Sequence, residues 1–344
     1  MNNTGRLTIK DVAKLAGVSH STVSRALNDS PLVGEATRER IRVIAEQTGF
    51  EFHEGARRLK NRKTGIVGLV YAAGLNDFRS SLYVNELFRD VRHELEKADL
   101  DALVVEAYDA MTGASNIARL IRQDKVDGFL IVHPSIHPED LELIDSHGLA
   151  MVRIHVISGD SFRDGTDFFC ADHIEGGRLA AVRLLEAGCR TFALGAIHNY
   201  EKSEFSDRTQ GFLAELEDAG IPSGDIAVRE CGDDYAAGYR FYAENRKRLS
   251  EIDGVFLPAD IVAFGFLNAL RESGIRVPDD IKIVAYDDSP ISAISIPTLT
   301  TIHQPREQLS LLACERMRAL LYDDMGGPAE GVFVPPTLVV RESC

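Results

Sequence analysis

Side chains capable of acid–base or metal chemistry are scattered along the sequence. The acid–base candidates are His133, His137, Asp160, Asp164, His173, Asp233 and Asp234, and the cysteines are Cys170, Cys189, Cys231, Cys314 and Cys344. No acid–base candidates stand at a spacing diagnostic of a catalytic pair, and the cysteines lie far apart and form no CxxC pair. We therefore expect solvated charges and helix caps, with no enzyme activity, cofactor, metal site or disulfide framework.

A second group of polar side chains, within residues 19–28, suits the recognition of DNA. Arg25 can form a bidentate pair with O6 and N7 of guanine, which contributes about 1–3 kcal/mol to base discrimination. His20 and Ser21 can reach neighbouring bases through less exclusive hydrogen bonds. Residues that can bind phosphate oxygens and fix the register are Ser19, Thr22, Ser24 and Asn28. A plain helix cap is the alternative role for Ser19, and the two roles are compatible.

Three short helices must position these side chains. Thr8 can cap a first helix with Asp11 as its capping-box partner, and Gly17 can end that helix. After a three-residue turn, Ser19 can cap a second helix, and a third runs from about residue 35 to residue 48. A tight glycine turn between the first two helices is typical of a helix-turn-helix, whose second helix enters the major groove. An incidental three-helix bundle is the alternative.

The charge of the chain is unevenly distributed. Over all 344 residues the formal net charge is −15, which by itself argues against a nucleic-acid partner. Residues 1–63, however, carry 12 Lys and Arg against 7 Asp and Glu, so the remaining residues hold 26 against 46. A positive head on an acidic body attracts phosphates at one end only, which orients the protein on DNA.

From residue 64 onward, apolar strand-like runs alternate with amphipathic helix-like stretches. The runs cover residues 66–71, 102–105, 128–132, 150–157, 192–197, 254–257 and 281–286. This alternation predicts an α/β fold of parallel sheets covered by helices, with ligands at the carboxyl ends of the strands. The sequence contains no GxGxxG, GxxxxGK[ST] or GxSxG motif, which argues against dinucleotide, nucleoside-triphosphate and hydrolase chemistry.

The first fifty residues carry a resemblance to a known family. Residues 7–50, LTIKDVAKLAGVSHSTVSRALNDSPLVGEATRERIRVIAEQTGF, closely resemble the reading head of the lactose/galactose repressor (LacI/GalR) family. Segments similar to the family's core markers are VDGFLIV (126–132), GGRLAAVRLLEAG (176–188), AYDDSP (285–290) and IPTLTTIHQP (296–305). The resemblance implies a periplasmic-binding-protein-like core of two doubly wound parallel α/β lobes after the helix-turn-helix domain.

The resemblance also implies a division of the chain. The expected parts are a helix-turn-helix domain at 1–52, a hinge at 53–63 and a ligand-binding core at 64–344, with lobe 1 at about 64–163 and 295–330 and lobe 2 at about 164–294 and 331–344. The segment GARRLKNRK (55–63) resembles the family's hinge helix, which inserts a leucine into the minor groove. Leu59 matches that wedge, flanked by Ala56 and Arg57. A basic linker of the same composition is the alternative.

Two core residues match the family's ligand contacts most directly. Arg208 begins the RxxGF pattern at 208–212, and a guanidinium can grip vicinal hydroxyls or a carboxylate. Asp287 in AYDDSP matches the family's sugar-binding aspartate, with a turn or cap role as the alternative. Asp260 aligns with the aspartate of the family's AND segment, in which Ala259 replaces the asparagine.

Two tyrosines complete the expected ligand site. Tyr235 is a candidate stacking platform for an apolar ring face. Tyr83 can replace an aromatic residue of the family's first-lobe loop, and a simple core role is equally open.

The resulting interpretation is a transcription regulator, expected to be a repressor, that binds an operator in double-stranded DNA as a homodimer. A small metabolite between the lobes, expected to be a sugar or sugar derivative, changes operator affinity. A purine or other non-sugar effector is the alternative. A further alternative is a solute-binding protein, which has the same core. Such a protein would be expected to have an export signal and no DNA-reading head. The start carries no secretory signal and no apolar run reaches about 18 residues, so we expect a cytoplasmic protein without a membrane partner.

Overall fold

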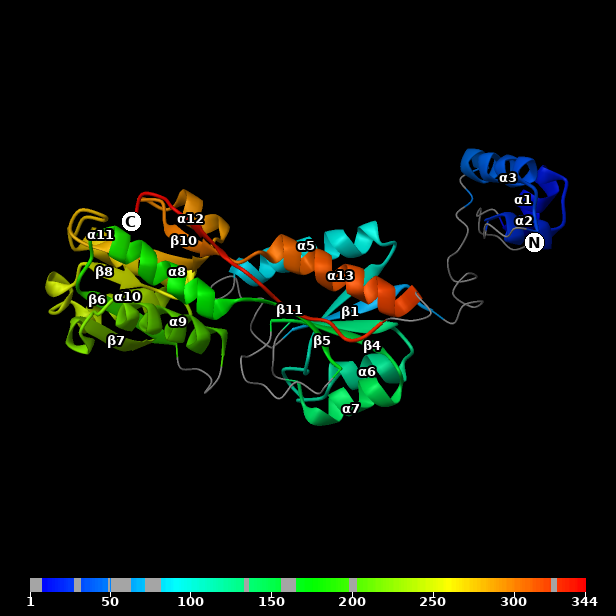
Figure 1. Cartoon of the computed structure of the whole chain (residues 1–344). Helices are drawn as coiled ribbons and strands as arrows, with labels where there is room; N and C mark the ends of the chain where they lie inside the picture. The colour runs from blue at the N-terminus through cyan, green and yellow to red at the C-terminus, as the bar shows by residue number, and fades with distance from the viewer. Residues whose placement is uncertain are drawn as a thin grey trace. The chain divides into compact units, whose positions relative to one another are not determined.

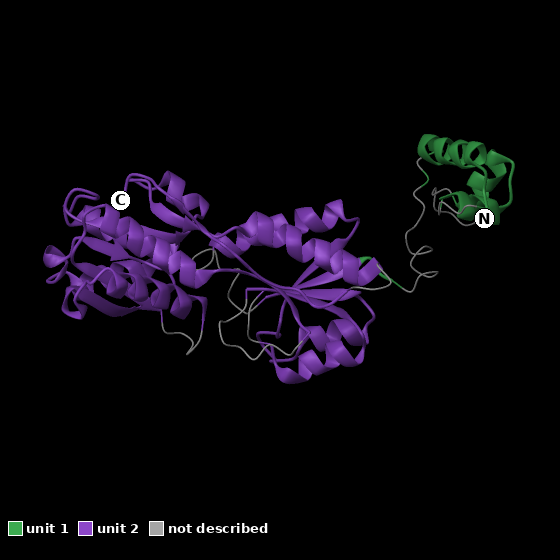
Figure 2. Ribbon diagram, in the orientation of Figure 1, with its two compact units in different colours: residues 1–65 green, residues 66–344 purple. Residues whose placement is uncertain are grey.

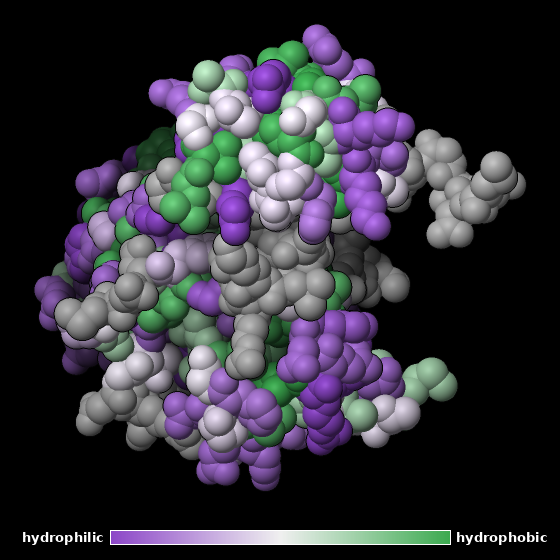
Figure 3. Space-filling model, turned by 90° about the vertical axis from the view of Figure 1, so that its right-hand side faces the viewer, coloured by the Kyte–Doolittle hydropathy of each residue, from purple (hydrophilic) through white to green (hydrophobic). Residues whose placement is uncertain are grey.

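The described part of the chain contains a set of helices distributed over two compact units, residues 1–65 and 66–344, and twelve strands that all lie in the second unit (Figure 1, Figure 2). The structure is a computed structural model that describes residues 8–27, 32–48, 50, 63–71, 82–132, 136–155, 165–197, 203–322 and 327–344. No helix in those ranges is long and apolar enough to cross a membrane. On the face drawn in Figure 3, hydrophilic and hydrophobic side chains are interspersed. Each unit has an apolar core of its own.

The first unit contains the helices α1 (Ile9–Ala16), α2 (His20–Leu27) and α3 (Glu35–Thr48). At the start of α1, the Asp11 carboxylate accepts hydrogen bonds from the Thr8 N–H at 2.9 Å and from the Thr8 hydroxyl at 2.6 Å. The helix ends at Gly17, whose φ of 64° lies in the left-handed region that favours glycine. The caps and the turn that the sequence predicts are confirmed.

A small apolar core joins these three helices. Its buried members are Val12, Ala13, Ala16, Val23, Ala26, Val33 and Ile41. Because they recur every three or four residues along a helix, each helix buries one face and leaves the opposite face accessible. The helical periodicity of the sequence therefore produces the helix-turn-helix unit.

The first lobe of the second unit is built on a sheet with the strand order β11-β5-β4-β3-β1-β2, in which all neighbours are parallel. The strands are β1 (Ile66–Tyr71), β2 (Asp101–Glu106), β3 (Gly128–Val132), β4 (Ala150–Ile154), β5 (Asp167–Ala171) and β11 (Gly331–Val334). Helices α5 (Leu82–Lys97) and α13 (Arg306–Tyr322) cover one face, and α6 (Asn116–Arg122) and α7 (Pro138–Ser146) cover the other (Figure 1).

The second lobe has the strand order β12-β10-β9-β8-β6-β7, parallel except for β12. Its strands are β6 (Phe192–Ile197), β7 (Ile226–Cys231), β8 (Gly254–Phe256), β9 (Lys282–Asp287), β10 (Thr300–His303) and β12 (Thr337–Val339). Helices α8 (His173–Glu186) and α9 (Glu204–Asp218) share one core with this sheet, and α10 (Tyr235–Asn245) and α11 (Asp260–Glu272) share another. Short helices are η1 (Ser223–Asp225), η2 (Leu249–Glu251) and α12 (Pro290–Ile294). The predicted core of two parallel α/β lobes is confirmed.

Three strands lie in a different lobe from the one expected. β5 pairs with β4 and β11 of the first sheet, although the expected boundary near residue 164 assigns it to lobe 2. β10 pairs with β9 of the second sheet, although the expected boundary near residue 295 assigns it to lobe 1. β11 pairs with β5 of the first sheet, although the expected boundary near residue 331 assigns it to lobe 2. Each crossing between lobes therefore comes several residues later. Strand membership follows the neighbour that completes the backbone hydrogen bonds, which one segment's sequence does not reveal.

Two glycines allow α8 and α9 to pack closely. A Cβ added at Gly177 would clash with the backbone carbonyl of Arg208, and one added at Gly211 would clash with that of Ile174. Helix backbone cannot move aside as a flexible side chain can. The close approach therefore depends on both glycines, and it sets the position of Arg208 relative to the start of α8.

Substitution of Gly211 tests this contact. We expect Gly211→Ala to lower the free energy of unfolding by about 1–3 kcal/mol or more, because the added methyl group forces the two helices apart. Gly224→Ala is the matched control, since a Cβ there meets nothing within 4 Å and Gly224 has no positive φ. The control should stay within about 0.5 kcal/mol of wild type. Urea denaturation measures both, and equal midpoints would contradict the packing role.

Candidate DNA-reading helix and effector site

Helix α2 separates its side chains into a buried set and an accessible set. Val23 and Ala26 are buried in the core of the first unit. His20 and Arg25 are exposed, and the partly buried residues are Ser21, Thr22 and Ser24. The two side chains with the longest reach for base edges are therefore accessible to a partner, while the other face of α2 anchors it to α1 and α3.

Ser19 caps α2. Its hydroxyl oxygen accepts a hydrogen bond from the Thr22 N–H at 3.1 Å and lies 2.7 Å from Ser21 Oγ and 2.8 Å from Thr22 Oγ1. The capping role is thus present, and its phosphate contact stays a prediction. The remaining predicted DNA contacts, which lie outside the described residues, are Asn28, Ala56, Arg57 and Leu59.

In the second unit, Arg208 of α9 places a cation in the protein interior. Only 3% of the residue is exposed. Its Nη1 donates to the Pro258 carbonyl oxygen and, at 3.4 Å, to Oδ1 of Asp287. Its guanidinium carbon lies 3.9 Å from the centroid of the Tyr286 ring. These contacts compensate a desolvation cost of several kcal/mol for a buried ion, and they hold the guanidinium in one position.

Two buried polar atoms beside this ion pair have no hydrogen-bond partner among the described residues. They are Nε of Arg208 and Oε1 of Gln304. Gln304 Nε2 donates to Oδ1 of Asp287 at 2.7 Å, so the three side chains meet at one carboxylate and form the Arg208 cluster. An unsatisfied buried donor or acceptor costs about 1–3 kcal/mol. A polar ligand that supplies an acceptor and a donor would remove both costs.

Asp287 ends β9 in a strained conformation. Its φ of 114° lies in the left-handed region, which side chains disfavour. Burial raises the pKa of its carboxyl to about 7, with the charge of Arg208 opposing the rise and that of Asp260 adding to it. Near neutral pH the carboxyl is therefore close to the balance between its neutral and ionised forms. Strain and a perturbed pKa together are typical of a binding site.

Asp260 does not fit the ligand-binding role expected from the sequence. The residue is fully buried, and its carboxylate accepts hydrogen bonds of 2.5–2.9 Å from the Ser289 N–H and the hydroxyls of Ser289, Ser292 and Thr301. Burial raises its pKa to about 6, and these hydrogen bonds oppose the rise. Both oxygens are thus occupied by α12, β10 and the turn between β9 and α12. Asp260 therefore joins the start of α11 to α12 and β10 within the second lobe.

The two predicted tyrosines have different surroundings. Tyr235 begins α10, where Asn268 Nδ2 donates to its hydroxyl at 3.1 Å and the ring lies 5.6 Å from that of Phe264. These contacts join α10 to α11. Tyr83 of α5 is buried, and its hydroxyl lies 3.0 Å from Nε2 of His155. Burial raises the pKa of Tyr83 well above its ordinary value. Contacts through His155, His173 and Tyr286 link this first-lobe tyrosine to Arg208.

Sequence reasoning did not single out Gln304 and Tyr286. Both belong to segments that carry the family resemblance, 296–305 and 285–290. An amide and a phenol offer no acid–base or metal pattern, so residue type alone gives no signal. The available signal was position, because Tyr286 lies at the carboxyl end of β9 and Gln304 directly after β10.

The accessible reading face of α2 and the two-lobed core with its buried polar cluster define the class of this protein, a helix-turn-helix DNA-binding unit joined to a periplasmic-binding-protein-like core. Residues 8–51 match the family "Bacterial regulatory proteins, lacI family", and residues 181–344 match the "Periplasmic binding protein-like domain". The chain belongs to the lacI family of bacterial regulatory proteins and is a DNA-binding transcriptional regulator. Members of this family are transcriptional regulators and not enzymes.

Curated relatives match along nearly the whole chain. The chain is 32% identical over 341 residues to the HTH-type transcriptional repressor PurR of Pectobacterium carotovorum subsp. carotovorum (strain PC1), which covers 98% of this chain and 96% of that protein. It is 31% identical over 342 residues to the protein of the same name from Yersinia pestis bv. Antiqua (strain Antiqua), with the same coverage. Both units therefore have counterparts in one related repressor.

Solved structures match both units as well. A complex of the transcriptional regulator CelR with cellobiose has a TM-score of 0.70 and 26% identity, covering 98% of this chain and 100% of that chain. A LacI family regulator from Enterococcus faecium with bound ribose has a TM-score of 0.68 and 25% identity, covering 81% and 98%. The lac repressor dimer bound to operator and the anti-inducer ONPF has a TM-score of 0.77 over 98% and 99%, and at 23% identity it shows the fold alone.

The raised pKa of Asp287 predicts a dependence of stability on pH. A carboxyl whose pKa is higher in the folded chain than in the unfolded chain destabilises the fold as pH rises from about 4 to about 7, because only the unfolded form ionises readily there. The amide of Asp287→Asn cannot ionise. We expect the variant's free energy of unfolding minus that of wild type to rise over this window by up to about 1.4 kcal/mol per pH unit, then level off. Urea denaturation at several pH values measures it.

Asp253→Asn is the control for this titration. Burial acts against ionisation of Asp253, but hydrogen bonds from the backbone N–H groups of Arg190 and Thr191 hold its pKa below the ordinary value. Its carboxyl is ionised in both folded and unfolded chains above about pH 5, so this variant should differ from wild type by a constant amount. A constant difference for Asp287→Asn as well would show that the Asp287 pKa is not raised.

Proposed function

We propose that this regulator is a repressor that binds a near-palindromic operator as a homodimer in the cytoplasm, with one helix-turn-helix unit on each half-site. The exposure of Arg25 and His20 on α2, opposite buried Val23 and Ala26, carries the DNA-binding part of the proposal. In this arrangement α2 enters the major groove and Arg25 pairs with a guanine. The remaining residues of the proposed DNA contacts are Ser19, Ser21, Thr22, Ser24 and Asn28 on or beside α2, and Ala56, Arg57 and Leu59 in a minor-groove hinge.

The proposed effector is a sugar or sugar derivative held at the Arg208 cluster. Arg208 Nε supplies a donor, Gln304 Oε1 an acceptor, and the Asp287 carboxyl can accept from neighbouring hydroxyls of one ring. Tyr83, from the first lobe, lies near the same charges, so a ligand there would contact both lobes. The similarity to the cellobiose complex of CelR and to the ribose-bound regulator supports a carbohydrate.

A purine or other non-sugar effector is the second candidate. The first curated relatives all carry the name PurR, at 29–32% identity. The same donor and acceptor could pair with the edge of a planar heterocycle, because a guanidinium and an amide also match ring nitrogens and carbonyl oxygens. The two candidates share the DNA-binding role and differ only in the ligand.

The switch follows from differential binding. An effector that contacts residues of both lobes binds one arrangement of the lobes more tightly than another and shifts the population towards it. If the two arrangements differ in operator affinity, the coupling free energy between effector and operator is the same in both directions. The proposal therefore requires that operator DNA change effector affinity by the same factor as effector changes operator affinity.

Arg25 variants test the DNA-reading helix. We expect Arg25→Lys to retain phosphate attraction but lose about 1–3 kcal/mol of discrimination between operator and random duplex, because lysine lacks the guanidinium fork. Arg25→Ala should lose that discrimination as well as affinity for random DNA. Selection of duplexes by the wild-type protein from a random pool supplies the operator, and mobility shifts over a range of salt concentrations measure the variants. Undiminished discrimination by both variants would rule out α2 as the reading helix.

A ligand screen tests the effector site. We expect millimolar carbohydrate to raise the melting temperature of the full-length protein, because binding to the folded state alone stabilises it. Gln304→Met removes the open acceptor with little change in volume. This variant should need at least about tenfold more carbohydrate for the same rise in melting temperature. Arg119→Gln, at an exposed arginine of α6, should respond like wild type. A response to purines alone would refute the sugar effector and leave the regulator in place.

A further inference from the structure

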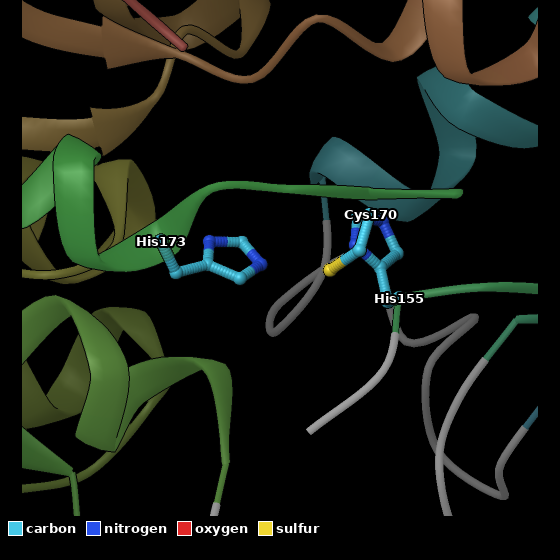
Figure 4. Close-up of side chains that lie close together, drawn as sticks. All are labelled: His155, Cys170 and His173. Carbon is cyan, nitrogen blue, oxygen red and sulfur yellow. The ribbon is translucent and has the colours of Figure 1, made fainter. Parts of the chain in front are cut away.

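Three side chains with metal-binding atoms converge beside the Arg208 cluster. His155 follows β4, Cys170 lies on β5, and His173 begins α8, so the group includes residues from both lobes (Figure 4). One potential ligand atom from each lies within 4.8 Å of the other two. This group departs from the expectation of no metal site: Cys170 and His173 are separated by only two residues, but His155 is distant from both along the chain. The crossing of the chain from β5 into α8 brings them together.

Two tyrosines orient the histidine rings. The Tyr83 hydroxyl lies 3.0 Å from Nε2 of His155, and the Tyr286 hydroxyl lies 3.1 Å from Nδ1 of His173. Histidines that bind metals usually have one ring nitrogen held by a second group, which fixes the ring and the tautomer. Here Tyr286 holds Nδ1 of His173, so Nε2 is the nitrogen of this ring that faces away from the phenol.

His173 is a buried member of the group with an unsatisfied ring nitrogen. It is 3% exposed, and its Nε2 has no hydrogen-bond partner among the described residues. Figure 4 shows its ring directed towards Cys170. His173 therefore presents an uncompensated ring nitrogen to the interior, beside the other two members of the group.

We propose that His155, Cys170 and His173 bind a divalent cation of the Zn²⁺ class, with a fourth coordination position for water or an added ligand. Two imidazoles and a thiolate are ligands that Zn²⁺ prefers, and three protein ligands with one open position are a common arrangement. With bond lengths of about 2.0–2.3 Å, tetrahedral ligand atoms lie about 3.3–3.8 Å apart. Because the three ligand atoms lie within 4.8 Å of one another, they must approach by about 1 Å to reach these distances, which rotation of the side chains can supply.

The charges around the site permit a cation. Arg208 opposes one, but its guanidinium is paired with Asp287 at 3.4 Å. Binding also displaces the thiol proton of Cys170 to solvent, which adds a negative charge directly on the metal. Because the ligands come from both lobes, a bound cation favours the lobe arrangement that brings them together. The site adjoins the proposed effector site, because Tyr286 contacts both Arg208 and His173, but its test requires neither operator nor effector.

The alternative is a purely structural group. The rings of His155 and His173 are stacked with centroids 6.0 Å apart and 30° between their planes, so aromatic packing alone could account for their proximity. Packing requires no metal uptake and no bond to sulfur. Metal stoichiometry and a spectroscopic signal from the thiolate therefore distinguish a metal site from aromatic packing without a measurement of DNA binding.

Equilibrium dialysis of the full-length, reduced, metal-stripped protein against Zn²⁺ and Co²⁺ tests the proposal. We expect one ion per chain, and a thiolate-to-cobalt charge-transfer band together with the visible bands of tetrahedral cobalt. Cys170→Ser should abolish the charge-transfer band and weaken Zn²⁺ binding at least about 100-fold, and His173→Gln should weaken it similarly. Cys314→Ser, at a buried cysteine of α13 outside the group, should bind as wild type does.

Thermal unfolding without metal checks that each variant is folded. Absence of stoichiometric uptake by the wild-type protein overturns the proposal, whatever the variants do. So does uptake without a thiolate band, because the ion is then bound elsewhere. A Cys314→Ser variant that loses the ion together with Cys170→Ser also overturns it, since the effect then belongs to cysteine replacement in general.

Discussion

The buried charge of Arg208 is the constraint on which the arrangement of the core depends. A guanidinium in the interior is tolerated only with compensation, here from the Pro258 carbonyl, the Asp287 carboxyl and the face of Tyr286. These partners come from different segments of the second lobe, so they must all be in place before the charge is compensated. The close packing of α8 on α9 fixes the helix that carries Arg208. Compensation is incomplete, since Nε has no partner among the described residues, and that deficit is what a ligand can use.

Asp260 forms the layer behind this ion pair. Its carboxylate accepts hydrogen bonds from three hydroxyls and one backbone N–H, and it thereby joins α11 to α12 and to β10. The charge of Asp260 acts on Asp287, and burial raises the pKa of both carboxyls, to about 7 for Asp287 and about 6 for Asp260. Asp260, which accepts four hydrogen bonds, has a structural role. Asp287 retains a titratable carboxyl beside Arg208 and Gln304.

The chain crosses between the two lobes after β5, β10 and β11, and two chemically distinctive side chains lie at these crossings. His173 starts α8 directly after β5, and Gln304 lies between β10 and α13. A side chain at a crossing is exposed to changes in lobe arrangement, whereas one within a sheet is not. Affinity for a ligand at these residues is therefore linked to the arrangement of the lobes, which is the physical requirement for a regulator that responds to its ligand.

Features that depend on near neighbours along the chain could be predicted from the amino-acid sequence. Helix periodicity, the Thr8 cap and Gly17 specify the helix-turn-helix, and the family pattern located Arg208 and Asp287, because helix caps and short motifs involve residues only a few positions apart. Only the tertiary structure decided which sheet β5, β10 and β11 join, that Asp260 is enclosed by hydrogen bonds, and that a cysteine and two histidines converge. Strand pairing and burial depend on partners far away in sequence, so no local pattern records them.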